Sequence, residues 1–174
     1  MKFNTSFALV VGSLLVSAPL AVAQAVTDPQ IAAIVVTANQ VDIDAGALAA
    51  SKAANAEVKT FGKQMVTDHT GVNKMATELV TRLKVTPEQN ETSRGLESGG
   101  AANVTSLKAL KGAAFDKAYL DHEISYHQQV LSALDDTLIP GAKNDELKAL
   151  LVKVRPAFVA HLEHARHLRS TLGQ

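Results

Sequence analysis

The segment YLDHEISYHQQVL, residues 119–131, places two histidines, a glutamate and two tyrosines in what the surrounding pattern predicts to be a helix. Glu123 and His127 are four residues apart, so one face of a helix presents both side chains. Imidazole and carboxylate groups bind zinc, iron, manganese or copper, and they also form hydrogen-bonded pairs. The segment therefore predicts a metal site or a polar network, provided that both groups face the interior.

The rotation of about 100° per residue in a helix indicates where these side chains point. In the helix predicted at residues 113–138, Asp116, Glu123 and His127 fall in the middle of the apolar arc. His122 falls on the boundary of that arc. A buried carboxylate without a partner is costly, so we expect these groups to pair with each other, with water or with a metal.

The other long helices also present ligand-type side chains on their apolar faces. By the same rotation, Asp42 lies inside the arc of the first helix, Asp68 and His69 inside that of the second, and His161 near the centre of the last. At about 1.5 Å per residue, most of these groups lie within two turns of one level. The candidate metal ligands are Asp42, Asp68, His69, Asp116, Glu123, His127 and His161.

The segment HLEHARHL near the carboxyl end carries three histidines at three-residue spacing. Each step of three residues turns the helix by about 300°, so the side chains fan away from the core. We therefore expect His161 to point inward, His164 to lie at the edge and His167 to be exposed.

Apolar residues recur at three- and four-residue spacing, which predicts an all-α chain. Asp28 followed by Pro29 is a helix-start signal, and Pro156 should kink the last helix because it lacks a backbone N–H. We predict four long helices, at residues 28–53, 55–84, 113–138 and 144–171.

The connection at residues 85–112 is the least regular part of the chain. TPEQ at residues 86–89 is a helix-start signal, ESGGAAN should break that helix, and residues 104–112 form a second short helix. Short linkers join the other helices in pairs, which makes those pairs antiparallel. The expected fold is an antiparallel four-helix bundle with short extra helices in the middle connection.

The amino-terminal segment has the pattern of a secretory signal peptide: one lysine, an apolar run and small residues before the cleavage site. Cleavage is predicted after Ala23, with Ala25 as the alternative, and residues 26–174 then form one domain. An uncleaved membrane anchor is the other interpretation, but the apolar run at residues 7–16 is shorter than the roughly 20 residues of a span. We expect a periplasmic protein of a diderm bacterium.

Composition excludes several classes of protein. The chain has no cysteine, which excludes disulfides, thiolate ligands and a cysteine-linked lipid anchor. Without Lys2, the chain has 16 of its 17 basic residues and 17 acidic residues, so its net charge is close to zero. This charge does not favour nucleic acid or anionic lipid as a partner. We expect no membrane span after the signal segment, and no motif of nucleophilic catalysis occurs. The sequence is compatible with a homodimer.

Three stretches resemble a known family: VKTFGKQMVTDHTGVNKM, LKGAAFDKAYLDHEISYHQQVL and LRSTL after FVAHLEHA. Over nearly the whole mature chain, the sequence is similar to exported bacterial proteins of unknown function, often labelled outer-membrane proteins and placed in the ferritin-like group. The resemblance implies a ferritin-like bundle and no activity. The positions that match best are Asp68-His69-Thr70, the stretch from Phe115-Asp116 to Tyr119, His127 and His161.

The ferritin-like di-iron pattern is not met, because Glu-x-x-His occurs nowhere in the chain. The leading interpretation is therefore an exported, non-enzymatic structural or stress-related binding protein with a polar histidine–carboxylate network in its core. The alternative is a metal-binding protein or metal-dependent redox enzyme, with iron, zinc, manganese or copper in the middle of the bundle.

Overall fold

The computed structural model describes residues 26–172, and every element of secondary structure among them is helical. The predicted signal peptide lies outside the described residues. The prediction of an all-α chain is confirmed. The five long helices of the described part are α1 (Asp28–Lys52), α2 (Ala56–Leu83), α3 (Glu91–Ala109), α4 (Gly112–Ala133) and α6 (Asp145–Thr171). The chain leaves α4 through a π-helical turn, η1 (Leu134–Leu138), and the short α5 (Ile139–Gly141).

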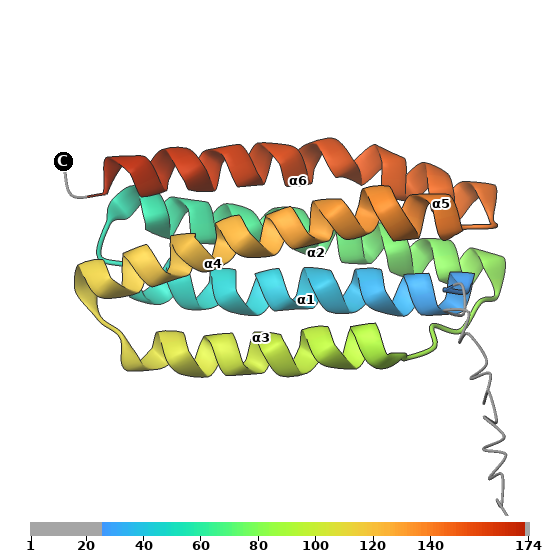
Figure 1. Cartoon of the computed structure of the whole chain (residues 1–174), viewed down its shortest axis with the longest axis horizontal. Coiled ribbons are helices and arrows are strands. Elements are labelled where there is room, and N and C mark those ends of the chain that lie inside the picture. Colours follow the sequence, from blue (N-terminus) through green and yellow to red (C-terminus); the bar gives the residue numbers. More distant parts are fainter. Residues whose placement is uncertain (1–25, 173–174) are drawn as a thin grey trace, which may run out of the picture.

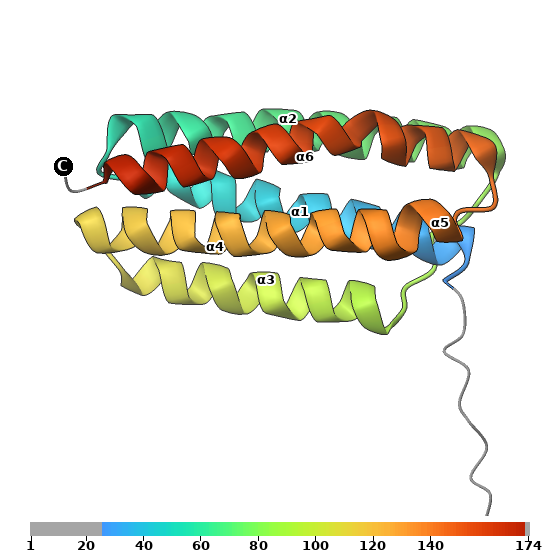
Figure 2. The ribbon, with the colours of Figure 1, turned by 45° about the horizontal axis from the view of Figure 1, so that its top comes forward.

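Four of the long helices close a ring around a common interior. Helix α1 packs against α2, α2 against α6, α6 against α4, and α4 against α1. Successive long helices run in opposite directions along the chain (Figure 1). Helix α3 lies along the outside of this ring, beside α1 and α4, in both views of the ribbon (Figure 2).

Helix α3 corrects the prediction for residues 85–112, which placed two short helices there. It is one helix of 19 residues that begins after Asn90 rather than after Thr86. Asn90 and Ser93 exchange side-chain and backbone hydrogen bonds, a reciprocal cap that fixes this start. The helix continues through Gly100, which is buried against Val41 of α1, because tertiary packing offsets the weak helix propensity of glycine.

The start of α1 also differs from the prediction. Thr27, not Asp28, is the N-cap, and it forms a capping box with Gln30. The Asp28 carboxylate instead accepts hydrogen bonds from the backbone N–H groups of Lys143 and Asn144, at 2.8 and 2.9 Å. This carboxylate thus ties the start of α1 to the start of α6.

Helices α1 and α2 approach each other closely at a pair of glycines. A Cβ atom on Gly46 would lie 2.8 Å from the carbonyl oxygen of Gly62, and one on Gly62 would lie 2.7 Å from that of Gly46. Both contacts are to backbone, which cannot move aside as a side chain can. Only glycine at these two positions therefore allows this separation of the two helices.

The interior consists of two apolar clusters with a polar layer between them. One cluster includes Ile31, Leu79 and Leu151, and the other includes Phe61 and Phe115. On each helix of the ring, buried polar residues separate the part in one cluster from the part in the other. These buried polar residues are Asn39 and Asp42 on α1, His69 on α2, Glu123 and His127 on α4, and His161 on α6.

Among the described residues, α1 is the one helix that is long and apolar enough to cross a membrane by length and composition. The sequence expectation of no further stretch of this kind therefore does not hold for α1. Most of its apolar window is buried against the rest of the protein, which is the pattern of a central core helix.

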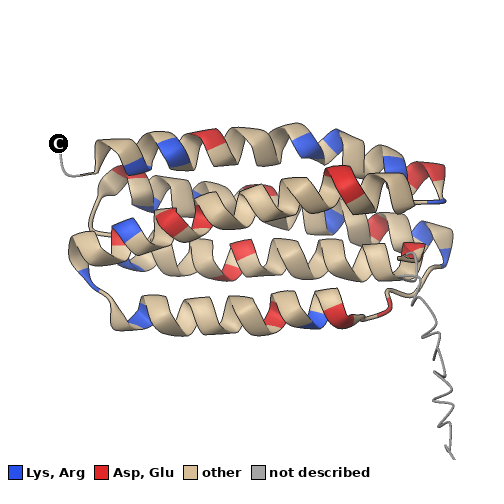
Figure 3. Ribbon diagram, viewed as in Figure 1, with Lys and Arg blue, Asp and Glu red and all other residues tan. Residues whose placement is uncertain are grey.

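The surface carries mixed charge. Lys and Arg residues and Asp and Glu residues are both spread over the helices, and neither kind is confined to one helix (Figure 3). Helix α6 extends from Asp145 to Thr171 and contains Pro156, and these bounds agree with the predicted residues 144–171.

Candidate metal centre

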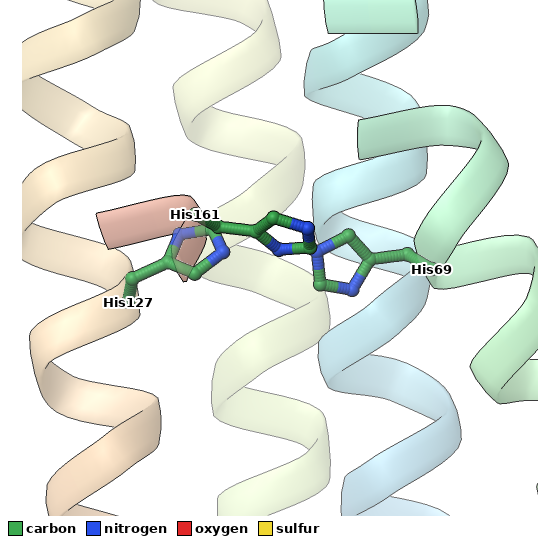
Figure 4. Close-up of side chains that lie close together, drawn as sticks. All are labelled: His69, His127 and His161. Atoms are coloured by element: carbon green, nitrogen blue, oxygen red, sulfur yellow. The ribbon is translucent and has the colours of Figure 1, made fainter. Parts of the chain in front are cut away.

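Three histidines from three helices meet in the polar layer. His69 comes from α2, His127 from α4 and His161 from α6, and their rings approach one another inside the bundle (Figure 4). None is more than 3% exposed. One ring nitrogen of each lies within 4.8 Å of those of the other two, and the ring centroids are 5.1 to 5.7 Å apart.

The tautomer of His69 follows from its neighbour Asn39. The Asn39 Nδ2 donates to the carbonyl oxygen of Val35 at 2.7 Å, which leaves its Oδ1 facing Nδ1 of His69 at 2.7 Å. An amide oxygen can only accept, so His69 carries its proton on Nδ1. Its Nε2 is therefore the nitrogen with a lone pair.

The other two rings are held in the same manner. The Nδ1 of His127 lies 3.0 Å from the carbonyl oxygen of Glu123, which can only accept. The Nε2 of His161 lies 2.9 Å from a carboxylate oxygen of Asp68. Each of these nitrogens is therefore the donor, and the opposite nitrogen of each ring carries the lone pair.

The three lone-pair nitrogens are buried, and none has a hydrogen-bond partner among the described residues. They are Nε2 of His69, Nε2 of His127 and Nδ1 of His161. A metal-binding histidine usually has this arrangement: one nitrogen donates to a fixed acceptor, which orients the ring and leaves the other nitrogen for the metal.

Two carboxyl groups are fully buried beside the histidines, Asp42 from α1 and Glu123 from α4. One Asp42 oxygen lies 3.5 Å from Nε2 of His69, and one Glu123 oxygen lies 3.5 Å from Nδ1 of His127. Asp42, Glu123 and His127 offer a second set of three ligand atoms within 4.8 Å of one another. His127 thus belongs to both sets.

The two carboxyl groups change each other's protonation. Burial raises the pKa of Asp42 well above its ordinary value, and the nearby Glu123 raises it further. Burial raises the pKa of Glu123 to about 8, while Asp42 and Tyr119 oppose part of that rise. The carboxyl and hydroxyl groups involved are close enough to interact, yet none meets the geometry of a hydrogen bond. Glu123 therefore keeps its proton at neutral pH in the metal-free protein.

The histidines are uncharged at neutral pH. Burial lowers the pKa of His69 to about 2, and the adjacent His127 and His161 lower it further. Burial also lowers the pKa of His127 to about 4. For His161, burial lowers the pKa against the opposing effect of Asp68. Neutral imidazole is the form that binds a metal, so no proton has to leave these rings first.

Asp68 lies at the rim of the site rather than in its centre. The rotation along the helix placed it on the apolar face, but its side chain is 39% exposed in the structure. Because it accepts a hydrogen bond from the Nε2–H of His161, it acts on the site by orienting that ring.

Asp116 is buried as predicted but does not join the other candidate ligands. Its two carboxylate oxygens accept hydrogen bonds from the backbone N–H groups of Ala54 and Asn55, at 3.0 and 2.8 Å. It therefore holds the turn between α1 and α2, near one end of the bundle.

The sequence analysis missed two residues that contact the site. Asn39 accepts a hydrogen bond from His69 and so orients its ring. In the sequence, this role is indicated only by an amide residue on the apolar face of the helix, one turn before Asp42. The ring of Phe158 covers His69 and His127, with centroids 5.1 and 5.9 Å away. A phenylalanine on an apolar face gives no signal that separates this position from ordinary core.

The three histidines of HLEHARHL fan out as predicted. His161 is buried, His164 is half-buried against the ring of Phe61, and His167 is exposed. His122 on α4 is half-buried, in agreement with its predicted place at the edge of the apolar arc.

A groove of about 400 Å³ between α2 and α6 connects the site with the surface. Exposed Thr67 and Lys153 line its outer part, and His69 and His161 line its inner part. Asp68 and Lys153 both line this groove, so it carries one group of each charge.

The donor atoms suit a transition metal ion. Metal–nitrogen distances are about 2.0–2.1 Å, so two nitrogens on one ion lie at most about 4.2 Å apart. A small inward movement of the three rings would reach that spacing. One or both carboxylates could complete the coordination once their protons leave, since metal binding to such groups releases protons.

Comparison with known proteins gives a family and no activity. No curated protein and no solved structure matches this chain. A family model described as a domain of unknown function, DUF4142, matches residues 15–168, which is most of the chain. The chain therefore belongs to the DUF4142 family of proteins of unknown function.

Proposed function

We propose that the core of this protein binds a first-row transition metal ion through His69, His127 and His161, with Asp42 and Glu123 as carboxylate ligands. One observation carries the proposal: three buried histidines each bring one ring nitrogen within 4.8 Å of the other two, and one nitrogen of each ring faces a fixed hydrogen-bond acceptor.

The alternative is a non-enzymatic protein whose core is only a hydrogen-bonded network. Such a network should satisfy its own members, because an unpaired buried polar group costs about 1–3 kcal/mol. Here the three lone-pair nitrogens have no hydrogen-bond partner among the described residues, and the Asp42 and Glu123 carboxyl groups have each other and Tyr119 nearby. A bound cation would compensate all of these groups together, which favours the metal over the network.

The ligand chemistry narrows the choice of metal. Three imidazoles and two carboxylates, without a sulfur ligand, suit iron, manganese, zinc or copper ions in the divalent state. A bound ion of this kind would supply a Lewis acid, or a redox centre in the case of iron, manganese or copper. In the protein, Asn39, Asp68 and the Glu123 carbonyl would hold the rings in orientation.

The arrangement of the helices supports a ferritin-like bundle as part of this proposal. In the chain, α3 connects α2 with α4 and runs back along the length of the molecule. Helices α2 and α4 therefore point in the same direction (Figure 1). A single long crossover of this kind is what distinguishes ferritin-like bundles from simple up-and-down ones. The ligands differ from the di-iron pattern, since His69 and His161 have no glutamate three residues before them.

Export to the periplasm is the second part of the proposal. It rests on the amino-terminal pattern of residues 1–25. Amino-terminal sequencing of the protein from a periplasmic extract tests it: a start at Gln24 or Val26 is expected, and an intact start at Met1 in the cytoplasm would contradict it.

The metal is tested by elemental analysis of the untagged protein after incubation with zinc, iron(II), manganese(II) and copper(II) in turn. We expect one ion per chain for at least one metal, lost in His69→Gln and in His127→Gln. His167→Gln is the matched control, because it removes an exposed histidine and should keep the metal.

If none of the four metals binds above the level of the His127→Gln variant, the proposal is wrong. The core histidines would then be structural. Folding of each variant is checked by circular dichroism, so that loss of metal is not confused with loss of structure.

A further inference from the structure

A second site lies beside the polar layer, where α3 packs against α1 and α4. An apolar cavity of about 220 Å³ is enclosed there by α1, α4, α6 and the edge of α3. Protein interiors rarely leave voids larger than a water molecule, and an engineered cavity of about 150 Å³ is enough to hold benzene. The cavity can therefore hold a small ring or a short alkyl chain.

The π-helical turn η1 forms one wall of this cavity. The N–H of Ile139 bonds to the carbonyl oxygen of Leu134, five residues back, and the buried Leu134 and Leu138 line the cavity. Such turns add one residue to a helical turn and occur mainly at functional sites. The turn therefore places two large apolar side chains of the core at the wall of the cavity.

The cavity adjoins a polar groove of about 420 Å³ on the outside of the bundle, between α3 and α4. Four residues line both spaces, and among them Thr92 and Gln129 are exposed while Tyr126 is buried. The two spaces thus meet at one mouth, with an apolar interior on one side and a polar surface on the other.

The groove contains polar atoms that no described residue satisfies. The Nε2 of His122 and the Nδ2 of Asn103 are buried without hydrogen-bond partners, and both residues line the groove. The ring of His122 stacks on that of Tyr126, with centroids 5.4 Å apart, which holds it at the mouth. Buried polar atoms of this kind normally have a partner, so a ligand group is one that would fit.

The groove has no acidic or basic side chain apart from the ring of His122. Its lining residues include no Lys, Arg, Asp or Glu. A charged head group would lose its hydration without gaining a counter-charge, which is costly. A hydroxyl, carbonyl or amide would instead match the two unsatisfied nitrogens.

We propose that this protein binds a small amphiphile with an uncharged polar head, with the apolar part in the cavity and the head in the groove at His122 and Asn103. The site does not include the proposed metal ligands. Asn39 and Phe158 contact both the cavity and the histidines, so the inference is tested on the metal-free protein.

The test titrates the full, metal-free mature chain with 1-octanol and with octanoate, followed by ¹H–¹⁵N NMR. We expect saturable shifts for 1-octanol that centre on the cavity residues Val130, Ala133, Leu138 and Val154. Octanoate at pH 7 should bind at least about tenfold more weakly, because its carboxylate finds no cation in the groove.

Two variants separate the two halves of the site. Ala133→Leu fills the cavity and should abolish saturable binding. His122→Phe keeps the stacked ring but removes its nitrogens, and should weaken 1-octanol about fivefold. Gln128→Leu, at an exposed position of α4 outside both spaces, is the matched control and should bind like the wild type.

Absence of saturable binding of 1-octanol by the folded wild type would overturn the inference. Octanoate binding as tightly as 1-octanol would overturn the uncharged head group. If Ala133→Leu does not fold, the His122→Phe variant provides the test. An unchanged affinity of this variant for 1-octanol would contradict the placement of the polar head group at His122.

Discussion

Asp116 and Glu123 are both buried carboxyl residues on α4, two turns apart, and their surroundings are opposite. Asp116 receives two hydrogen bonds from the backbone of the turn between α1 and α2. Glu123 and its neighbour Asp42 receive none from the described residues, and burial raises the pKa of both. A buried acid with backbone donors stabilises a fold, whereas a buried acid without donors is a cost that a bound ligand can offset.

A large effect on stability at every pH is expected at the structural acid. Asp116→Ala leaves two backbone N–H groups without their acceptor, and each such loss costs about 1–3 kcal/mol. We expect the free energy of unfolding to fall by about 3 kcal/mol in urea titrations, with metal content unchanged. Asp121→Ala, an exposed acid on the same helix, should change stability by less than about 1 kcal/mol. Equal effects of the two substitutions on the free energy of unfolding would contradict the structural role of Asp116.

A bound metal should stabilise the protein through the site of Glu123, and not through Asp116. At a free zinc concentration 100 times its dissociation constant, we expect the wild type to gain about 2.7 kcal/mol in the free energy of unfolding. Asp116→Ala should gain the same amount, because its acid is not a ligand. His127→Gln should gain almost nothing, since His127 belongs to both ligand sets. A similar gain in His127→Gln would place the ion elsewhere.

The pH dependence of the metal-free protein isolates Glu123. Its folded pKa of about 8 lies above its ordinary value of 4.5, so the penalty is absent below pH 4.5 and grows as the pH rises toward 8. Glu123→Gln should remove this slope, which is at most about 1.4 kcal/mol per pH unit. The measurement is the difference in unfolding free energy between wild type and variant, in which the contributions of the buried histidines cancel. A difference that stays constant from pH 5 to 8 would contradict the raised pKa.

The smallest effect is expected at the outer histidine of α6. His167→Ala removes an exposed side chain and should change stability by less than about 0.5 kcal/mol. His161→Ala, two turns earlier, leaves Asp68 without its partner and opens a space in the core, so it should cost several times more. Thermal unfolding of the two variants side by side measures this contrast.

Helical rotation predicted the buried site residues well because it depends only on local geometry. Asp42, His69, Glu123, His127 and His161 all lie in the interior where the rotation placed them. The same reasoning did not distinguish Asp116 from Glu123, since both fall on the apolar face. The distinction comes from a turn about 60 residues away in the chain, and local geometry contains no information about that contact.

The remaining differences also come from contacts distant in sequence. The expected break in ESGGAAN does not occur, because Gly100 packs directly on Val41 and the packing of α3 supports the helix. Asn39 became important through His69, which is 30 positions away. The π-helical turn η1 follows no pattern in the spacing of apolar residues, so the cavity beside it could not be predicted.

The contact between Gly46 and Gly62 determines more than the separation of two helices. Gly46 lies one turn beyond Asp42 on α1, and Gly62 lies two turns before His69 on α2. Coordination bonds tolerate deviations of only about 0.2 Å. A methyl group at either glycine would act as a wedge between the backbones and carry Asp42 away from His69. The two glycines thus set the separation of Asp42 and His69, and with it the size of ion that the proposed site would accept.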